Sequence, residues 1–248
     1  MSETHRRDFA VRYRVRSSDL RNRRRLATDV PHVIASLACR LLDFVIPRSC
    51  AGCDSPVNGD AVWCEPCSEA VVPLKRNIEE YTPQGHRVLA PFSYEGPVAK
   101  AIHRLKFSNR PELAHSLGQR LATEVVLARI PSGATIVPVP TTPERIVERG
   151  YNQSALLASA MSRKSGIRLI PTALRRNHSA PHQVGADKAQ RARQVAGAFT
   201  ADSGIIANAK VILVDDVVTT GATSAACAKA IEAAGGQLIA VVAVARVL

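Results

Sequence analysis

The chain has 248 residues, which is enough for one well-packed core and a small appendage. Its hydrophobic content of 46% is typical of a soluble protein, but aromatic residues make up only 4%, which favours a core of Ala, Val, Leu and Ile. The formal net charge of +12 indicates an anionic ligand, a nucleic-acid partner or simply a basic surface. No stretch of about 18 apolar residues occurs, so we expect no membrane span.

Residues 1–29 carry nine Arg and four acidic residues without sustained apolar periodicity, which predicts a basic, disordered arm. The acids count against a transit peptide, and the segment lacks the apolar core and cleavage pattern of a signal peptide, so we expect the cytoplasm. Residues 30–47 then predict an amphipathic helix whose apolar face contains Leu37, Leu41 and Val45. Pro47 ends this predicted helix.

Four cysteines within residues 48–76 form the pattern C-x2-C-x10-C-x2-C, namely Cys50, Cys53, Cys64 and Cys67. Two knuckles of this spacing can place four thiolates at the corners of a tetrahedron, which suits zinc. Paired disulfides are the poorer alternative in a reducing cytosol. Because all four ligands would be cysteines, the metal would have no open position for catalysis. We therefore predict a small zinc-ribbon-like module with a structural zinc ion.

From about residue 87 onward, strand-like and helix-like apolar segments alternate. We expect a strand and turn at 87–96, strands at 135–140, 168–174, 210–216 and 237–248, helices at 97–107, 112–130, 154–166 and 223–236, a loop at 141–153 and a polar segment at 175–197. Strands with nearly continuous apolar runs, separated by helices, are typical of a parallel sheet that is covered on both faces. The predicted fold class is therefore α/β, with 87–248 as one domain.

One predicted strand ends unusually, in the sequence VILVDDVVTTGAT at residues 211–223. Val211–Val214 should be buried, and Asp215 and Asp216 are expected where the strand leaves the sheet. Ligand sites in such sheets lie at the carboxyl ends of the strands. The following turn leads into a helix, whose backbone N–H groups and dipole favour an anion. The candidate phosphate turn consists of Thr219, Thr220, Gly221, Ala222 and Thr223.

This sequence resembles the phosphoribosyl-diphosphate (PRPP) binding motif of type I phosphoribosyltransferases, in which the motif lies at a strand end of a central parallel sheet. The resemblance implies that Asp215 and Asp216 hold the ribose 2- and 3-hydroxyls and that residues 219–223 wrap the 5-phosphate. It also implies Mg²⁺ bound through the substrate phosphates. In the alternative without a ligand, Asp216 caps the next helix and Asp215 is merely exposed.

Further motifs narrow this resemblance. The tetracysteine pattern and the motifs outside it together resemble the ComF/GntX family, from about residue 34 to the C-terminus. These motifs are Lys106-Phe107, VPVP at 137–140, ERGYNQ at 148–153, HQVG at 182–185 and GAF at 197–199. The family consists of bacterial proteins that join a zinc-ribbon-like module to a phosphoribosyltransferase domain. One branch is linked to DNA uptake in competence.

The family resemblance also implies roles for basic residues outside the PRPP motif. Arg145 and Arg149 stand in the loop that binds diphosphate in the family. Segment 175–193 corresponds to a flexible loop that closes over PRPP, with a solvated surface loop as the alternative. The basic residues of this segment are Arg175, Arg176, Lys188, Arg191 and Arg193.

Two functions follow from the sequence. The first is a PRPP-binding phosphoribosyltransferase of unknown acceptor. In the family that the motif resembles, purine-salvage members usually have a third acid in the motif, where this chain has Thr219, which argues against 6-oxopurine salvage. Amido-transferring members carry a glutaminase domain, for which we expect no room in this chain, and this argues against glutamine-dependent amination. The second is a non-catalytic accessory protein for DNA uptake or processing, which binds single-stranded DNA or a helicase and uses PRPP or a nucleotide only as a ligand. His103 and His115 are expected as surface or packing residues, and Cys227 as a packed one.

Overall fold

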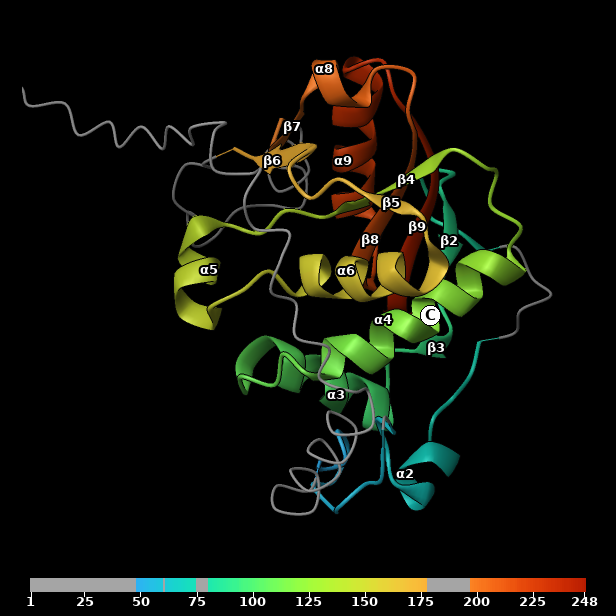
Figure 1. The fold of residues 1–248 in the computed structure, drawn as a ribbon, viewed down its shortest axis with the longest axis vertical. Coiled ribbons are helices and arrows are strands. Elements are labelled where there is room, and N and C mark those ends of the chain that lie inside the picture. The colour runs from blue at the N-terminus through green and yellow to red at the C-terminus, as the bar shows by residue number, and fades with distance from the viewer. Residues whose placement is uncertain (1–47, 60, 75–79, 178–196) are drawn as a thin grey trace, which may run out of the picture. The chain divides into compact units, whose positions relative to one another are not determined.

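The structure is a computed structural model that describes residues 48–59, 61–74, 80–177 and 197–248 (Figure 1). These residues belong to one compact unit, Pro47–Leu248. The predicted basic arm at 1–29 and the predicted helix at 30–47 lie outside the described residues. The predicted domain boundaries at 48–76 and 87–248 stay predictions.

A seven-stranded sheet forms the centre of this unit. Its two longest strands, β8 (Lys210–Val218) and β9 (Gln237–Arg246), pair in parallel with each other. Shorter strands flank them, in the order β1-β2-β9-β8-β4-β5 with β3 also beside β9, and only β1 is antiparallel to its neighbour. The short strands are β1 (Glu80–Tyr81), β2 (Arg87–Leu89), β3 (Phe92–Ser93), β4 (Ala134–Pro138) and β5 (Arg168–Leu169).

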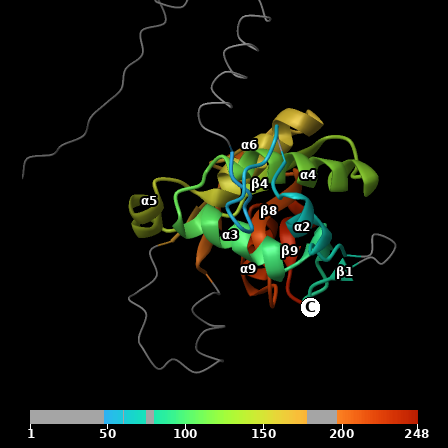
Figure 2. The same ribbon diagram turned by 90° about the horizontal axis from the view of Figure 1, so that it is seen from below.

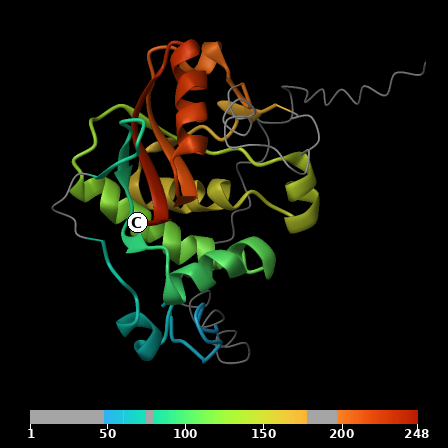
Figure 3. The same cartoon turned by 180° about the vertical axis from the view of Figure 1, so that it is seen from behind.

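Helices cover both faces of this sheet (Figure 2). On one face lie α3 (Gly96–Phe107), α4 (Leu113–Leu127) and α6 (Gln153–Ser165). On the other lies α9 (Ala222–Ala233), which Figure 3 shows in front of the strands. The predicted fold class, an α/β protein with a parallel sheet and flanking helices, is thus confirmed.

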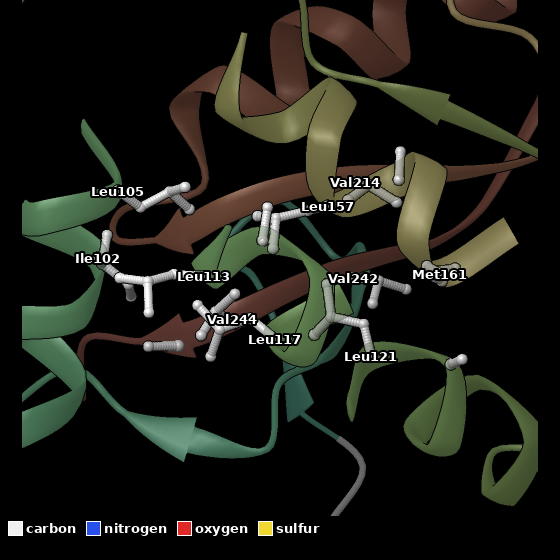
Figure 4. Close-up of a cluster of buried hydrophobic side chains, with 14 of the residues drawn as sticks. Ile102, Leu105, Leu113, Leu117, Leu121, Leu157, Met161, Val214, Val242 and Val244 are labelled. Atoms are coloured by element: carbon white, nitrogen blue, oxygen red, sulfur yellow. The ribbon is translucent and has the colours of Figure 1, made fainter. Parts of the chain in front are cut away.

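The two faces of β8 explain this division of the core. Ile212 and Val214 belong to the apolar cluster that contains α3, α4 and α6, whereas Val211 and Leu213 join the cluster that contains α9. Successive side chains of a strand point to opposite faces, so four consecutive apolar residues bury both. Figure 4 shows how side chains of α3, α4 and α6 converge on Val214 and its neighbours in β9. The predicted burial of Val211–Val214 is confirmed.

Strand β8 loses one neighbour before the other. On the β4 side the register ends at the pair Pro138 and Val214, after which the N–H of Val139 donates to the carbonyl oxygen of Val214 at 2.9 Å. On the β9 side pairing continues as far as Val218. Asp215 and Asp216 therefore lie within β8, and the expectation that the strand leaves the sheet at the acids is wrong. The strand is open at these residues on the β4 side alone.

Two expected strands are interrupted by proline. The expected strand at 168–174 splits into β5 and β6 (Leu174–Arg176), and β6 pairs with β7 (Phe199–Ala201) in a separate two-stranded sheet. Pro171 lies in the turn between them and has no N–H to donate to a sheet. Pro91 likewise lies between β2 and β3, although both of these strands pair with β9.

Short helices also occur where none was predicted. The expected loop at 141–153 contains α5 (Pro143–Arg149), which begins at Thr142 because its hydroxyl accepts a hydrogen bond from the N–H of Arg145. Two further short helices are α2 (Glu65–Glu69) and α8 (Ser203–Ile206). Each of these three helices is shorter than two full turns, so apolar periodicity in the sequence cannot indicate it.

Helices α4 and α6 approach each other closely at Gly118. A Cβ atom at this position would lie 2.6 Å from the Cβ of Ala160 and 2.6 Å from the carbonyl oxygen of Leu157. Both distances are shorter than a van der Waals contact, so any side chain there would force the two helices apart. The packing of this layer on the sheet therefore requires glycine at residue 118.

Replacing Gly118 by Ala should destabilise the protein, even though Ala is about 1 kcal/mol more favourable than Gly inside a helix. Overpacking of a well-packed core costs about 1–3 kcal/mol, so we expect a net loss of stability and a lower midpoint of thermal unfolding. Thr123→Ala, on the exposed side of α4, serves as the control and should leave the midpoint nearly unchanged. A midpoint for Gly118→Ala equal to that of the unmodified protein would contradict the close approach.

Candidate functional site

A pocket of about 370 Å³ opens beside the carboxyl ends of β4 and β8. Three separate parts of the chain bring predicted site residues to its wall, namely Asp215, Asp216, Thr219 and Thr223 from the PRPP-like motif, Arg145 and Arg149 from α5, and Arg176 from β6. Other side chains of the wall were not predicted as site residues, among them Tyr94, His103, Lys106, Phe107, Gln153 and Ser154. The tertiary structure thus gathers the acidic pair, part of the phosphate turn and three of the predicted arginines.

Each acid of the pair has a partner of its own. Asp216 is buried, and its Oδ2 lies 2.9 Å from Nζ of Lys106 in the last turn of α3. Asp215 is partly buried, and its Oδ1 accepts hydrogen bonds from Oγ of Ser154 at 3.0 Å and from the N–H of Asp216 at 2.9 Å. Helix α9 begins at Gly221, and the side chain that accepts from its first N–H group is that of Thr220, so the alternative role of Asp216 as a helix cap is wrong.

Asp215 has an unusual protonation equilibrium. Burial, followed by the charge of Asp216, raises the pKa of Asp215 to about 7. The hydrogen bonds from the N–H of Asp216 and from Ser154, and the charge of Lys106, oppose this increase without cancelling it. Asp215 is therefore partly protonated at neutral pH, and a hydroxyl donor or a cation that enters the pocket would favour its ionised form.

The turn between β8 and α9 requires glycine at residue 221. Gly221 has a φ of 74°, and a Cβ atom there would lie 2.7 Å from the Cβ of Thr82 in the turn between β1 and β2. The first N–H groups of a helix have no acceptor within the helix, and here a side chain accepts from that of Ala222, through Oγ1 of Thr220 at 3.4 Å. A hollow of about 20 Å³ beside them is lined by Asp215, Val217, Val218, Thr219, Gly221, Ala222, Thr223 and Ser224. These donors suit a small anion.

The arginines predicted to bind diphosphate occupy different positions. Arg145 and Arg176 both line the pocket, and the pKa of Arg176 is lowered by burial and then by the charge of Arg145. Arg149 also lines the pocket, but its guanidinium lies 4.6 Å from the centre of the Phe107 ring. Arg175 is exposed and does not line the pocket. Lys188, Arg191 and Arg193 lie outside the described residues.

The four predicted metal ligands lie together, with their sulfur atoms all within 4.8 Å of one another. The N–H groups of Gly52 and Cys64 both donate to the Sγ of Cys50 at 3.3 Å, as suits a sulfur that carries negative charge. Burial and the neighbouring sulfur atoms raise the pKa of Cys67 to about 12, so this thiol would ionise at neutral pH only beside a cation. The cluster of Cys50, Cys53, Cys64 and Cys67 can therefore hold a metal ion.

Helix α3 connects the cysteine cluster with the pocket. Arg104 donates to the carbonyl oxygen of Cys50 at 2.9 Å and forms two hydrogen bonds of 2.6 Å with the carboxylate of Asp54. Two residues further along the same helix, Lys106 forms the ion pair with Asp216. The last turn of α3 thus contacts both the segment that contains the cysteines and the acidic pair.

Comparison with known proteins finds relatives that are named for DNA utilization and for competence. Over 188 residues the chain is 31% identical to DNA utilization protein YhgH from Escherichia coli (strain K12), an alignment that covers 73% of this chain and 82% of the relative. It is 27% identical over 183 residues to competence protein F from Haemophilus influenzae, with 70% and 80% covered. The chain belongs to the ComF family.

Other comparisons of this ComF protein add less. No family model matches the sequence. Among solved structures, it is similar to the glutamine PRPP amidotransferase from B. subtilis, with a TM-score of 0.40 and 19% identity, over 57% of this chain and 30% of the other. None of the helices in the described ranges is both long enough and apolar enough for a membrane crossing.

Two residues that hold the acidic pair of this ComF protein escaped prediction as site residues. Lys106 belongs to a family motif, but nothing local indicates that the last turn of α3 reaches Asp216. Ser154 lies in the first turn of α6, where serine is common for reasons unrelated to a site. His103 lies on the exposed pocket wall and Cys227 is buried, as expected for both.

The raised pKa of Asp215 predicts a pH-dependent effect of Asp215→Asn. An unfolded Asp titrates near about pH 4, whereas folded Asp215 titrates at about 7, so ionisation weakens the fold as the pH rises between these values. The neutral Asn removes this cost and can still accept the hydrogen bond from Ser154. We expect the variant to be more stable than the unmodified protein at pH 8, by about 2 kcal/mol, and to show no such gain at pH 4.

Thermal or denaturant unfolding at several pH values measures this difference. Glu232→Gln, which replaces an exposed carboxylate of α9, is the control and should show no pH-dependent gain. A stability difference for Asp215→Asn that stays constant from pH 4 to pH 8 would contradict the raised pKa.

Proposed function

We propose that this ComF protein binds PRPP together with Mg²⁺ and acts as a phosphoribosyltransferase. The observation that carries this proposal is the meeting of three groups in one pocket. These are the acidic pair on the open side of β8, the start of α9, and the cations Lys106, Arg145, Arg149 and Arg176. A ligand with hydroxyl donors at its centre and phosphates at both ends would satisfy all three.

Each part of PRPP has a counterpart in the pocket under this proposal. Asp215 and Asp216 accept hydrogen bonds from the ribose hydroxyls, which also favours the ionised form of Asp215. The turn at 219–223 holds the 5-phosphate through the first N–H groups of α9. Arg145 and Arg176 lie on the same pocket wall and neutralise the diphosphate. Mg²⁺ would be held through the ligand phosphates and would supply further neutralising charge.

The proposed chemistry breaks the bond between ribose C1 and the diphosphate oxygen. Positive charge develops on the sugar and negative charge on the leaving diphosphate, so fixed cations stabilise the transition state. Arg176 suits this role because it is partly buried, where its charge is poorly screened. Binding also fixes the geometry between sugar and acceptor, which by itself removes part of the barrier.

We further propose zinc as the ion of the cysteine cluster. Four thiolates in a compact arrangement form a closed tetrahedral set, which is typical of structural zinc. Reduced cysteines fit the cytoplasm, which we propose as the compartment of this protein. In this role the metal holds residues 48–67 in the conformation in which the carbonyl oxygen of Cys50 accepts from Arg104.

A second candidate function is contact with DNA. The names of the relatives from E. coli and H. influenzae refer to DNA utilization and to competence, and the net charge of +12 suits a polyanion. In this version PRPP or a nucleotide is a ligand without turnover, and single-stranded DNA or a DNA-processing protein is the partner. The described part of the chain offers few exposed aromatic rings for stacking bases, which favours the first candidate.

Calorimetric titration with PRPP and Mg²⁺ tests the main proposal. We expect binding to the unmodified protein, and a loss of affinity of about tenfold to hundredfold in Asp215→Asn, because a hydrogen bond to a charged group contributes about 1.5–3 kcal/mol. This variant is expected to be at least as stable as the unmodified protein, so a loss of binding cannot come from unfolding. Glu232→Gln is the charge-matched control and should bind normally.

Absence of PRPP binding, or equal binding by Asp215→Asn, would overturn the proposal. A chain that ignores PRPP but binds an oligothymidylate, with an affinity that falls steeply as salt rises, would favour the DNA candidate instead.

Metal analysis and chelation test the zinc proposal. We expect about one zinc ion per chain, which is lost in Cys67→Ser. Cys227→Ala should retain it, because Cys227 is a buried cysteine that does not belong to the cluster. Chelation under reducing conditions should lower the unfolding midpoint by about 5–10 °C, because the cluster anchors the last turn of α3. Unchanged zinc content in Cys67→Ser would show that the ion binds elsewhere.

A further inference from the structure

A second hollow adjoins the PRPP pocket. It has a volume of about 400 Å³ and shares three wall residues with the pocket, Lys106, Phe107 and Arg149. Its other wall residues are Asn109, Glu148, Gly150 and Tyr151. We call it the Phe107 chamber. Because the two hollows share a wall that begins at Lys106, beside the acidic pair, the chamber starts where the reactive end of a bound sugar would lie.

The shared wall contains an aromatic ring that is kept exposed. Phe107 ends α3 and is 55% exposed, although a large apolar side chain is normally buried. The guanidinium of Arg149 lies 4.6 Å from its ring centre, and the ring of His103 lies 4.9 Å away at a tilt of 46°. Such an arrangement holds the ring in place, so that a planar group can stack on it or beside it.

Arg149 is fixed in position but not neutralised. Its Nη1 donates to Oε1 of Gln153 at 3.2 Å, while its buried Nε has no hydrogen-bond partner in the described part of the chain. No carboxylate among the described residues forms an ion pair with it. Because Nε is buried, a ligand in the chamber would meet this guanidinium at its outer nitrogens, where an anionic group would form a charge-assisted hydrogen bond.

The charges of the chamber favour one class of ligand. Arg149 provides a cation and Asn109 an amide, while the charge of Lys106 is already paired with Asp216. Glu148 is the one acid of the wall and is exposed. A basic or amino-substituted ring would need acceptors that this wall scarcely offers. A planar ring with a carboxylate would stack on Phe107 and place its charge beside Arg149.

We infer that the Phe107 chamber binds the acceptor of the transfer, and that this acceptor is a planar heteroaromatic carboxylate. This inference rests on the proposed function. A ring nitrogen of the acceptor donates its lone pair to form the bond to ribose C1. The bond between C1 and the diphosphate oxygen breaks at the same time, and the electron pair of that bond leaves with the diphosphate. Where the attacking nitrogen carries a proton, the proton passes to the departing diphosphate. Where it carries none, the product ring keeps a positive charge.

Calorimetry on the full chain tests the ligand class, with pyridine and pyrimidine monocarboxylates as probes and the carboxamide of each as its neutral counterpart. With PRPP and Mg²⁺ present, we expect the carboxylates to bind about tenfold more tightly than the amides, because a charge-assisted hydrogen bond is roughly twice as strong as a neutral one. Arg149→Gln should abolish this preference. Phe107→Leu should weaken both probes by about tenfold through loss of the stacking surface.

Matched controls separate these effects from general disturbance. Val147→Ala lies on α5 beside the chamber wall but does not line it, and Arg163→Gln removes an exposed cation of α6, so both should bind the probes normally.

Three results would overturn the inference while PRPP binding stands. These are equal or tighter binding of the amides, no binding of any probe with or without PRPP, and probe binding that neither Phe107→Leu nor Arg149→Gln alters. Binding of an oligothymidylate that Phe107→Leu abolishes, without binding of carboxylates, would assign the chamber to nucleic acid and overturn it too. Failure of the proposed function is a separate result, because there PRPP itself does not bind.

Discussion

Two adjacent carboxylates on one strand are the constraint around which the pocket is built. Like charges on neighbouring side chains repel each other, so the pair needs compensation. The structure supplies a cation to Asp216 and a hydroxyl and an N–H to Asp215. The pairing of β8 with β4 also ends at Val214, one residue before Asp215, which leaves the acids open to a ligand. Helices α3 and α6 must lie where their side chains reach this strand.

Helix α3 therefore has more than a packing role. Its apolar side chains pack on the sheet beside α4, while its last turn contacts the cysteine-containing segment through Arg104 and the acidic pair through Lys106. The proposed metal centre and the proposed ligand site are thus connected by one rigid element. The cysteine-containing segment thus helps to hold the helix that carries Lys106, which neutralises Asp216. This is a physical reason for joining that segment and the ligand site in a single chain.

The two hollows divide the proposed reaction between them. The motif in β8 and the turn before α9 provide carboxylates and backbone donors, which are suited to a sugar phosphate. The ends of α3 and α5 provide an exposed ring and a fixed guanidinium, which are suited to a planar anion. Lys106 and Arg149 lie at the boundary, so the charges of one ligand influence the binding of the other.

The sequence by itself determined the parallel α/β fold, the buried core of β8 and the grouping of the four cysteines, and it indicated the residues that we propose for the ligand site. Each of these depends on local patterns, either an apolar run, a ligand spacing or the short motif at 211–223. Only the tertiary structure decided that β8 continues past the acids, that Pro171 divides an expected strand between two sheets, and that Lys106, Ser154 and Phe107 face the pocket. The physical reason is that strand pairing and side-chain contacts between distant segments depend on how helices pack, for example at Gly118, and no local pattern records that packing.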